Sequence, residues 1–414
     1  AMKITDVELH QVHPSLQAWN QDVLRLFQGE IWDTRTIVVL HTDNGLEGLG
    51  EFVGSVNESV EQDLAQLRGT NPCQWLAHPQ LNIWLAPAIY DLVGKANGVP
   101  AYQFFGPLQR SWVPVSSWTV SQTPALMAAE VEHAVEQGYT WIKYHTHHFH
   151  NIIDQTRAMQ EVAPAGFKVH YDVNFDNTVD HIVRLGQELS QFPIAGLIED
   201  PLRTFDLEGY KVLRQKSALP IVFHHLPLGG REALMGLADG YMLGHAPVGE
   251  VVKRAGLFEA ANVPFMMQNV GGHITQAFVV HMAAAFDRAT LHHVTGSQLW
   301  AEDVVRPSPE VIGGQVPVPQ DPGLGLELDR EALERMKAAV PEPMPRALIR
   351  VQVERGPTVY ARPPLSRHSQ LKEHAIAGVG EGYDRPVDQD FCYDDGSDRF
   401  AALWERTADG SMVE

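Results

Sequence analysis

An eightfold alternation of short apolar runs and amphipathic stretches dominates the middle of the chain, from Trp112 to about Gly313. Each run is rich in residues that favour β-strands and ends in polar residues, and the stretch that follows carries apolar residues at helical spacing. The runs occupy residues 113–120, 140–145, 167–174, 195–201, 220–225, 240–245, 264–269 and 289–294. Consecutive β/α units in this number predict an α/β fold with a (β/α)8 barrel; a doubly wound open sheet is the alternative.

The segments on either side of the alternation predict separate parts of the molecule. Residues 1–111 indicate an α+β domain, with strand-like runs at the start and a hairpin turn at Asp43-Asn44-Gly45. Helical patterns follow at residues 57–69, 74–86 and 87–97. We therefore expect an α+β domain over residues 1–111, the barrel over residues 112–313, and a C-terminal segment over residues 314–414. The portion from residue 345 onward gives no functional indication.

Charge and composition exclude several classes of partner. The chain has 31 basic and 51 acidic residues, a net charge of -20, so its mean field repels nucleic acid and anionic membranes. No apolar run is long enough for a membrane span. The two cysteines, Cys73 and Cys392, are too few for a disulfide framework and predict a reduced, cytoplasmic protein. An anionic substrate would need a local positive centre, supplied by a lysine or a metal.

The ends of the predicted strands are where a barrel places its catalytic residues. Here those ends carry many titratable side chains, whereas helix caps favour Ser, Thr, Asp and Asn rather than histidine. The residues concerned are Lys143, His145, Asp172, Asn174, Glu199, Asp200, His224, His225, His245, Gln268, Asn269, His292 and His293. Packing alone does not account for so many polar tips on apolar strands, and we interpret them as an active site.

A divalent metal site is one consequence of this arrangement. Asp172, Glu199 and His225 end three consecutive strands, so two carboxylates and an imidazole are expected to converge. Carboxylates suit Mg²⁺ or Mn²⁺, and an imidazole shifts the preference towards Mn²⁺, Fe²⁺ or Zn²⁺. Lys143 and His145 share one face of their strand and are expected to point into the same mouth.

Six short motifs, in this order, resemble segments of the enolase superfamily, and more closely its mandelate racemase and muconate lactonizing enzyme-like members. They are "NGLEGLGE" (44–51), "GVPAYQFFGPLQRSWVPVSSW" (98–118), "GYTWIKYH" (138–145), "HYDVN" (170–174), "LIEDPL" (197–202) and "DPGLGLELD" (321–329). The resemblance extends from residue 2 to about residue 340. It implies that residues 1–111 cap the barrel and that the protein is a homo-oligomer, from dimer to octamer.

In this superfamily a divalent ion, usually Mg²⁺, binds the carboxylate of the substrate, and a base removes the proton α to it. The metal ligands carry over to Asp172 and Glu199. The third is usually a glutamate that follows a glycine, and here His224 and His225 take those two positions, so His225 replaces the glutamate. His145 takes the position of the basic lysine, and Lys143 is expected to hold the substrate carboxylate. The usual His–Asp dyad is absent, which leaves His245 as a second base or acid.

The substrate is expected to contact further residues around the mouth. These are Asn174, His224, Gln268, His293 and, from the cap loop 16–34, Trp19. The loop histidines His147, His148 and His150 are expected to be solvated. His293 is favoured over His292 as the residue that faces the mouth.

Together, these observations predict a metal-dependent enzyme that acts on a small-molecule carboxylate, a hydroxy or sugar acid. Loss of the β-hydroxyl after proton abstraction would make it a dehydratase; epimerisation, racemisation or cycloisomerisation would use the same first step. Two other classes stay open. His145-Thr146-His147 is an HxH at a strand end, which resembles the dinuclear zinc hydrolases of the amidohydrolase type. A non-catalytic member of the superfamily is the third possibility.

Overall fold

The computed structural model describes residues 2–147, 149–174, 177–368 and 387–414. Its centre is a closed barrel of parallel strands in the order β4 to β11, completed by pairing of β11 with β4. The strands are β4 (Trp112–Val120), β5 (Trp141–His145), β6 (Lys168–Asp172), β7 (Ala195–Glu199), β8 (Ile221–Phe223), β9 (Gly240–Gly244), β10 (Phe265–Gln268) and β11 (His293–Val294). The (β/α)8 prediction is therefore confirmed, and the open sheet is excluded.

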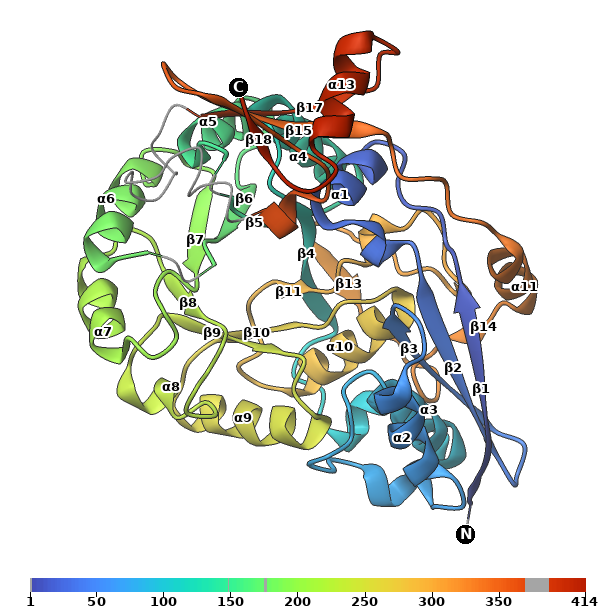
Figure 1. Cartoon of the computed structure of the whole chain (residues 1–414). Helices are drawn as coiled ribbons and strands as arrows, with labels where there is room; N and C mark the ends of the chain where they lie inside the picture. Colours follow the sequence, from blue (N-terminus) through green and yellow to red (C-terminus); the bar gives the residue numbers. More distant parts are fainter. Residues whose placement is uncertain (1, 148, 175–176, 369–386) are drawn as a thin grey trace.

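Helices surround the barrel and cover its outer face (Figure 1). They are α4 (Pro124–Glu136), α5 (Ile152–Val162), α6 (Val179–Leu189), α7 (Leu207–Lys216), α8 (Glu232–Met235), α9 (Val248–Ala260) and α10 (His273–Ala285). Several begin at a side-chain cap, such as Asn151 before α5 and Asp206 before α7, because these side chains accept hydrogen bonds from otherwise unpaired backbone N–H groups.

The interior of the barrel changes from apolar to polar along its axis. Leu197, Val222, Met242 and Met266 form an apolar cluster against Trp141. Because side chains alternate along a strand, Lys143 shares the inner face with Trp141, and Glu199 shares it with Leu197. Polar groups therefore occupy the layer above the apolar cluster, nearer the carboxyl ends of the strands.

The N-terminal part is an α+β cap whose antiparallel sheet consists of β1 (Ile4–Val12), β2 (Arg35–Thr42) and β3 (Glu47–Val53). Between β1 and β2 lie α1 (Gln21–Gln28) and the 3-10 turn η1 (Glu30–Trp32). After β3 come α2 (Glu58–Leu67), η2 (Pro72–Trp75), α3 (Ala86–Asn97) and η3 (Ala101–Phe104). The helix predicted over residues 74–86 is wrong, because Pro72 and Pro79 break that stretch into short turns.

Several short elements connect the barrel back to the cap. They are η4 (Ser297–Leu299), β12 (Val305–Arg306), β13 (Gln315–Pro317), β14 (Glu327–Leu328) and α11 (Arg330–Ala338). β13 pairs antiparallel with β4, and α11 packs against β1. The chain thus leaves the barrel and covers the outer edge of the cap before it continues.

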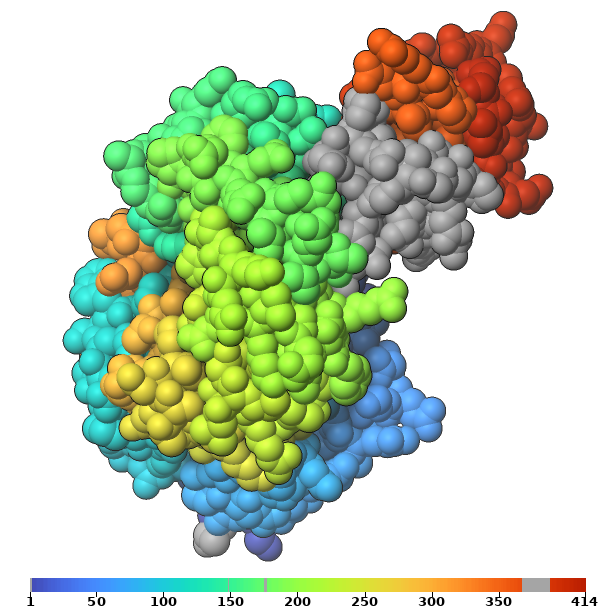
Figure 2. Space-filling view, turned by 90° about the vertical axis from the view of Figure 1, so that its left-hand side faces the viewer, coloured from blue at the N-terminus to red at the C-terminus, as the bar shows by residue number. Residues whose placement is uncertain are grey.

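The last residues form a small antiparallel sheet in the order β17-β15-β16-β18, accompanied by the helix α13. Its elements are β15 (Ala347–Val353), β16 (Thr358–Ala361), η5 (Leu365–His368), β17 (Val387–Tyr393), α13 (Asp398–Arg406) and β18 (Met412–Val413). Figure 2 shows this sheet standing out from the body of the barrel. Ile349 and Val351 pack in one apolar cluster with Leu24 and Phe27 of α1. The sheet therefore supports the cap loop.

In the described part of the chain, no helix combines the length and apolar character needed to cross a membrane. Cys73 and Cys392 are both free thiols.

Candidate active site

Lys143 is the centre of a buried polar cluster inside the barrel. Its Nζ lies 2.5 Å from Glu199 Oε2 and 3.1 Å from Asp172 Oδ2. The same ammonium group donates to Gln268 Oε1 at 2.6 Å, which ties β5 to β10 across the barrel. Burial alone would lower the pKa of Lys143, but the charges of Glu199 and Asp172 outweigh burial and raise it. Lys143 is therefore a fixed cation rather than a base.

Glu199 accepts from three nitrogen donors. Besides Lys143, His170 Nε2 donates to Oε2 at 2.6 Å and His224 Nδ1 donates to Oε1 at 2.9 Å. Burial would raise the pKa of Glu199, but the charge of Lys143 and these hydrogen bonds hold it well below its usual value. Burial lowers the pKa of His170, so its ring is neutral, and its Nδ1 accepts from His292 Nε2 at 2.9 Å.

His145 is oriented by a neighbour that follows the next strand, β6. Its Nδ1 donates to Asn174 Oδ1 at 2.8 Å and lies 3.4 Å from Asp172 Oδ2. Asn174 is itself held in place, since its Nδ2 donates to the carbonyl oxygen of Thr146 at 3.1 Å. Donation from Nδ1 leaves Nε2 of the neutral ring without a proton, so Nε2 is the atom that can act as a base.

His245 extends from the strand on the other side of the barrel, because β9 lies four strands from β5 in a ring of eight (Figure 1). It lines a cavity of about 380 Å³ between the barrel mouth and the cap. Trp32, Phe52 and Trp84 form much of the cap side of that cavity. Burial, with smaller contributions from nearby positive charge, lowers the pKa of His245, so its imidazole is neutral at pH 7.

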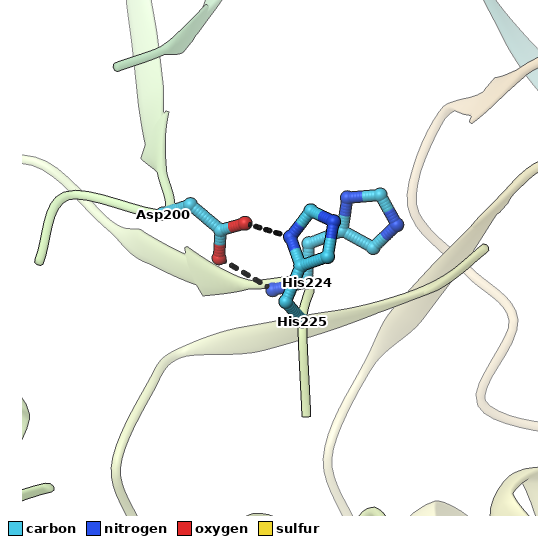
Figure 3. A group of neighbouring side chains, drawn as sticks. All are labelled: Asp200, His224 and His225. Atoms are coloured by element: carbon cyan, nitrogen blue, oxygen red, sulfur yellow. Dashed lines mark hydrogen bonds and ion pairs between the residues drawn. The ribbon is translucent and has the colours of Figure 1, made fainter. Parts of the chain in front are cut away.

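A second group of side chains lies at the ends of β7 and β8. Figure 3 shows Asp200 bonded to His225, with the ring of His224 beside that of His225. His225 Nδ1 donates to Asp200 Oδ2 at 2.6 Å, and the backbone N–H of His224 donates to Asp200 Oδ1 at 2.8 Å. The two imidazole centroids lie 4.3 Å apart. One ligand atom from each of the three residues lies within 4.8 Å of the other two.

Backbone strain accompanies three of these strand ends. Asn174, Asp200 and His245 have φ values of 54°, 44° and 51°. Side chains other than glycine rarely adopt this left-handed region, and such strain is commonly held at functional sites.

The predicted third metal ligand does not reach the predicted pair. Among the described residues, Asp172, Glu199 and His225 do not form a group whose ligand atoms all lie within 4.8 Å, whereas Asp200, His224 and His225 do. His224 rather than His225 bonds Glu199, because β8 ends at Phe223 and the first histidine after it turns inward. His225 turns outward, and its side chain is 54 % exposed.

Two predicted substrate contacts lie elsewhere. His293 does not face the mouth: its Nδ1 accepts from the backbone N–H of Met267, and its Nε2 donates to the carbonyl oxygen of Ala289. His292 is the inward-facing histidine, stacked on Trp141 with the ring centroids 3.8 Å apart. Trp19 stacks on His133 of the outer helix α4 at 4.1 Å and is a packing residue.

The loop histidines also differ from expectation. His150 is buried rather than solvated, with Nδ1 2.8 Å from Ser121 Oγ and Nε2 2.7 Å from Gln389 Oε1. His147 packs edge-on against Phe27 of α1. His148 lies outside the described residues.

Sequence reasoning missed two residues of the cluster. His170 lies two residues before Asp172, on the same face of β6, so strand alternation was a sufficient signal. Asp200 was noted as a strand-end residue, but its pairing with His225 depends on how the backbone turns after β7.

The family model for the enolase C-terminal domain-like family matches residues 126–332. The chain belongs to this family, and with it to the mandelate racemase and enolase superfamily of barrel enzymes with an N-terminal cap. The predicted family is thereby confirmed.

Curated relatives are similar over most of their length. The cis-3-hydroxy-L-proline dehydratase of Roseibium aggregatum is 24% identical over 357 residues, which cover 78% of this chain and 96% of the relative. The D-galactonate dehydratase of Xanthomonas axonopodis pv. citri is 23% identical, covering 73% of this chain and 91% of the relative. These relatives support an enzyme of the superfamily's reaction type.

Solved structures show the same fold. A mandelate racemase/muconate lactonizing family protein from Azoarcus sp. EbN1 superimposes with a TM-score of 0.64 at 21% identity, covering 82% of this chain and 98% of that one. An enolase from Thermobispora bispora, complexed with magnesium and formate, gives 0.65 at 23% identity, covering 81% and 93%.

Proposed function

We propose that this protein dehydrates a small hydroxy acid of the sugar-acid type, by removing the proton α to its carboxylate and then expelling the β-hydroxyl group. The observation that carries this proposal is the placement of His145 and His245 on opposite sides of a mouth that contains the buried cation Lys143. The dehydratases among the relatives support the choice of elimination over isomerisation.

A divalent ion belongs to this proposal. Members of the superfamily use one, and carboxylates and imidazoles converge at the ends of β6, β7 and β8, so the donor chemistry fits such an ion. Asp172, Glu199, Asp200, His224 and His225 are the side chains available to hold it. When bound, the ion would stabilise the negative charge of an enediolate. The resemblance implies Mg²⁺, whereas imidazoles are ligands that Mn²⁺, Fe²⁺ and Zn²⁺ accept more readily.

The residues of the chain supply the remaining chemistry. Lys143 attracts the substrate carboxylate and opposes the charge that develops on it. Nε2 of His145 takes the α-proton, because Asn174 holds the ring with Nδ1 protonated. Binding of the anionic substrate favours uptake of a proton by His245, and the resulting imidazolium, on the opposite face, delivers that proton to the departing hydroxyl group, which leaves as water. The apolar side chains of the cap limit access of bulk water to the cavity.

Epimerisation is the second candidate, and the same pair of histidines favours it. If the imidazolium form of His245 delivers its proton to the α-carbon instead of the β-hydroxyl, the configuration at that carbon is inverted. A zinc hydrolase built on the HxH of His145 has less support, since among the described residues the group with metal-ligand spacing is Asp200, His224 and His225.

Deuterium exchange tests the proposal. The protein is incubated with a panel of sugar acids and divalent ions in deuterated water, and deuterium at the α-carbon and 2-keto acid product are followed by NMR. Wild type should exchange the α-proton of at least one acid, and Asp172→Asn should lose exchange. Asp180→Asn, on the exposed face of α6, is the matched control and should behave as wild type. Unchanged exchange in Asp172→Asn would contradict the mechanism.

A further inference from the structure

Resting on the proposed function, we propose that the divalent ion binds to Asp200, His224 and His225 at the ends of β7 and β8, and that it is a transition metal rather than Mg²⁺. These ligands differ from Asp172 and Glu199, which the family resemblance implies as metal ligands.

The interior pair is already neutralised by the chain itself. The ammonium group of Lys143 lies 3.1 Å from Asp172 and 2.5 Å from Glu199, which is the space that a cation shared by these carboxylates would need. His170 and His224 also donate to Glu199, so both of its oxygens face nitrogen donors. A second cation here would meet the charge of Lys143 at short range inside a buried site, where repulsion is weakly screened.

The outer group has the geometry of a metal site. A carboxylate oxygen and two ring nitrogens, one from each residue, lie within 4.8 Å of one another. Donor atoms bound to a common ion are about 3 Å apart, so small rotations of the rings suffice. Both Asp200 oxygens accept hydrogen bonds, from the backbone N–H of His224 and from His225 Nδ1, and the ion would replace the second of these bonds. Asp200 is buried, whereas the side chain of His225 is 54 % exposed, so one side of the group is open to solvent.

A carboxylate holds the ring of His224 in a fixed orientation, as is common for histidines that bind a metal ion. Its Nδ1 donates to Glu199 at 2.9 Å, which leaves Nε2 as the coordinating atom. That nitrogen lies over Gly244 at the end of β9, where an added Cβ would come within 2.3 Å of it. Glycine at this position therefore leaves the space that Nε2 occupies, and the carboxylate–imidazole pair connects the ion to the Lys143 cluster.

The ligand types select the ion. Two imidazoles and one carboxylate are the ligand set of non-haem iron and catalytic zinc sites, and they favour Mn²⁺, Fe²⁺, Co²⁺ or Zn²⁺ over Mg²⁺, which prefers oxygen ligands. Three protein ligands leave open positions for the oxygens of a substrate.

The test measures binding of the metal alone. Protein stripped with chelator is titrated with Co²⁺, Zn²⁺ and Mg²⁺ by calorimetry, and the visible absorption of bound Co²⁺ reports imidazole ligands. We expect about one Co²⁺ or Zn²⁺ per chain and at least tenfold weaker affinity for Mg²⁺. His225→Ala and Asp200→Asn should each weaken Co²⁺ affinity at least tenfold and change its spectrum. Because His225 is exposed, His225→Ala is expected to stay folded, as circular dichroism would show.

Two further variants separate this site from others. Asp172→Asn should keep the Co²⁺ affinity and spectrum of wild type. His10→Ala removes an imidazole that also bonds a carboxylate, Glu8 at 2.9 Å, but lies on the cap, and should bind Co²⁺ as wild type does. Loss of Co²⁺ in Asp172→Asn with retention in His225→Ala would overturn the inference, as would preferential binding of Mg²⁺ or no binding at all.

The outcome is separable from that of the proposed function. Co²⁺ bound through His225 without α-proton exchange in any sugar acid would leave the metal site standing and remove the proposed reaction. If the His225→Ala variant still exchanges the α-proton and binds Co²⁺ with the affinity of wild type, the proposed reaction would stand and the proposed metal site would be removed.

Discussion

The positive charge of Lys143 compensates the negative charges of two carboxylates, Asp172 and Glu199, and its side chain has no exposure to solvent. Moving an ammonium group out of water is costly, and only close, well-oriented partners offset that cost. Gln268 occupies a further donor position of the ammonium group, so the polar contacts of this buried cation extend over three strands. The cluster is therefore a unit, and each member is stable there because the others are present.

The first prediction follows from this interdependence. Lys143→Met should lower the free energy of unfolding by about 3–5 kcal/mol, because it leaves two buried carboxylates uncompensated. Lys253→Met, which removes an exposed ion pair with Glu250 on α9, should change it by less than about 1 kcal/mol. Urea unfolding of both variants at pH 7 is the measurement. Equal effects would show that the cluster contributes nothing to stability.

Asn174 positions His145 and is not itself a reacting group. Asn174→Gly removes the acceptor while accommodating the φ of 54°. We expect kcat to fall by up to about a hundredfold with little change in KM, because the ring loses its fixed tautomer and orientation. Asn262→Gly, at an equal φ of 54° beyond α9, is the matched control. Steady-state kinetics on the exchanging acid separate the two parameters; a change in KM alone would contradict the positioning role.

At the scale of elements, strand alternation predicts side chains only as far as the strand continues. Lys143 and His145 lie on one β-strand, and both reach the interior as their spacing indicates. The adjacent histidines could not be assigned in this way, because β8 ends before His224 and β11 contains only His293 and Val294. Beyond the last ladder hydrogen bond the backbone turns freely, and tertiary contacts decide which ring faces inward.

The C-terminal sheet shows a second limit of local patterns. His150 lies in a barrel loop, yet its partner Gln389 is 239 residues further along the chain. Helical and strand periodicity report neighbours within one element and carry no information about such a contact. For that reason the barrel and the cap could be predicted from the sequence, whereas the docking of residues 347–361 on α1 could not.

Acid should weaken the contact between the C-terminal sheet and the barrel loop that carries His150. Burial lowers the pKa of His150 from 6.5 to about 4, so the folded protein keeps the ring neutral. The unfolded or undocked chain takes up a proton below about pH 6.5 and the docked chain only near pH 4, so stability is present above pH 6.5 and is lost as pH falls between these values. Hydrogen exchange in β17 should therefore accelerate from pH 6.5 to pH 4.5, after correction for intrinsic rates.

A non-titrating side chain provides the comparison for this prediction. His150→Asn keeps a polar group beside Ser121 but cannot take up a proton, so the pH dependence of protection in β17 should flatten even if absolute stability falls. The same slope in His150→Asn and wild type would assign the acid effect to other groups.

At the scale of the whole molecule, one buried network joins the cap to the barrel above the cavity. Arg35 of β2 donates to Asp303 at 2.8 Å and lies 3.3 Å from Glu51 of β3. Glu51 accepts from the backbone N–H of Thr275 in α10, and Asp303 accepts from that of His273. The guanidinium carbon also lies 4.6 Å from the ring centroid of Trp300. Because Glu51 lines the cavity, this network sets how the cap lies over His245.

Arg35→Met should therefore weaken the contact between the cap and the barrel. We expect the free energy of unfolding at pH 7 to fall by about 3–5 kcal/mol, because Glu51 and Asp303 are left as uncompensated buried carboxylates. The deficit should shrink as pH falls towards 5. Burial would raise the pKa of Asp303, but the charge of Arg35 holds it below its usual value, and burial already raises the pKa of Glu51. Removing Arg35 raises both pKa values further, so the variant takes up more protons than wild type and the repulsion is relieved. Arg184→Met, on the exposed face of α6, is the control and should change stability by less than about 1 kcal/mol. Chemical unfolding at pH 7 and pH 5 is the measurement, and a deficit independent of pH would mean that Arg35 acts through packing rather than through its charge.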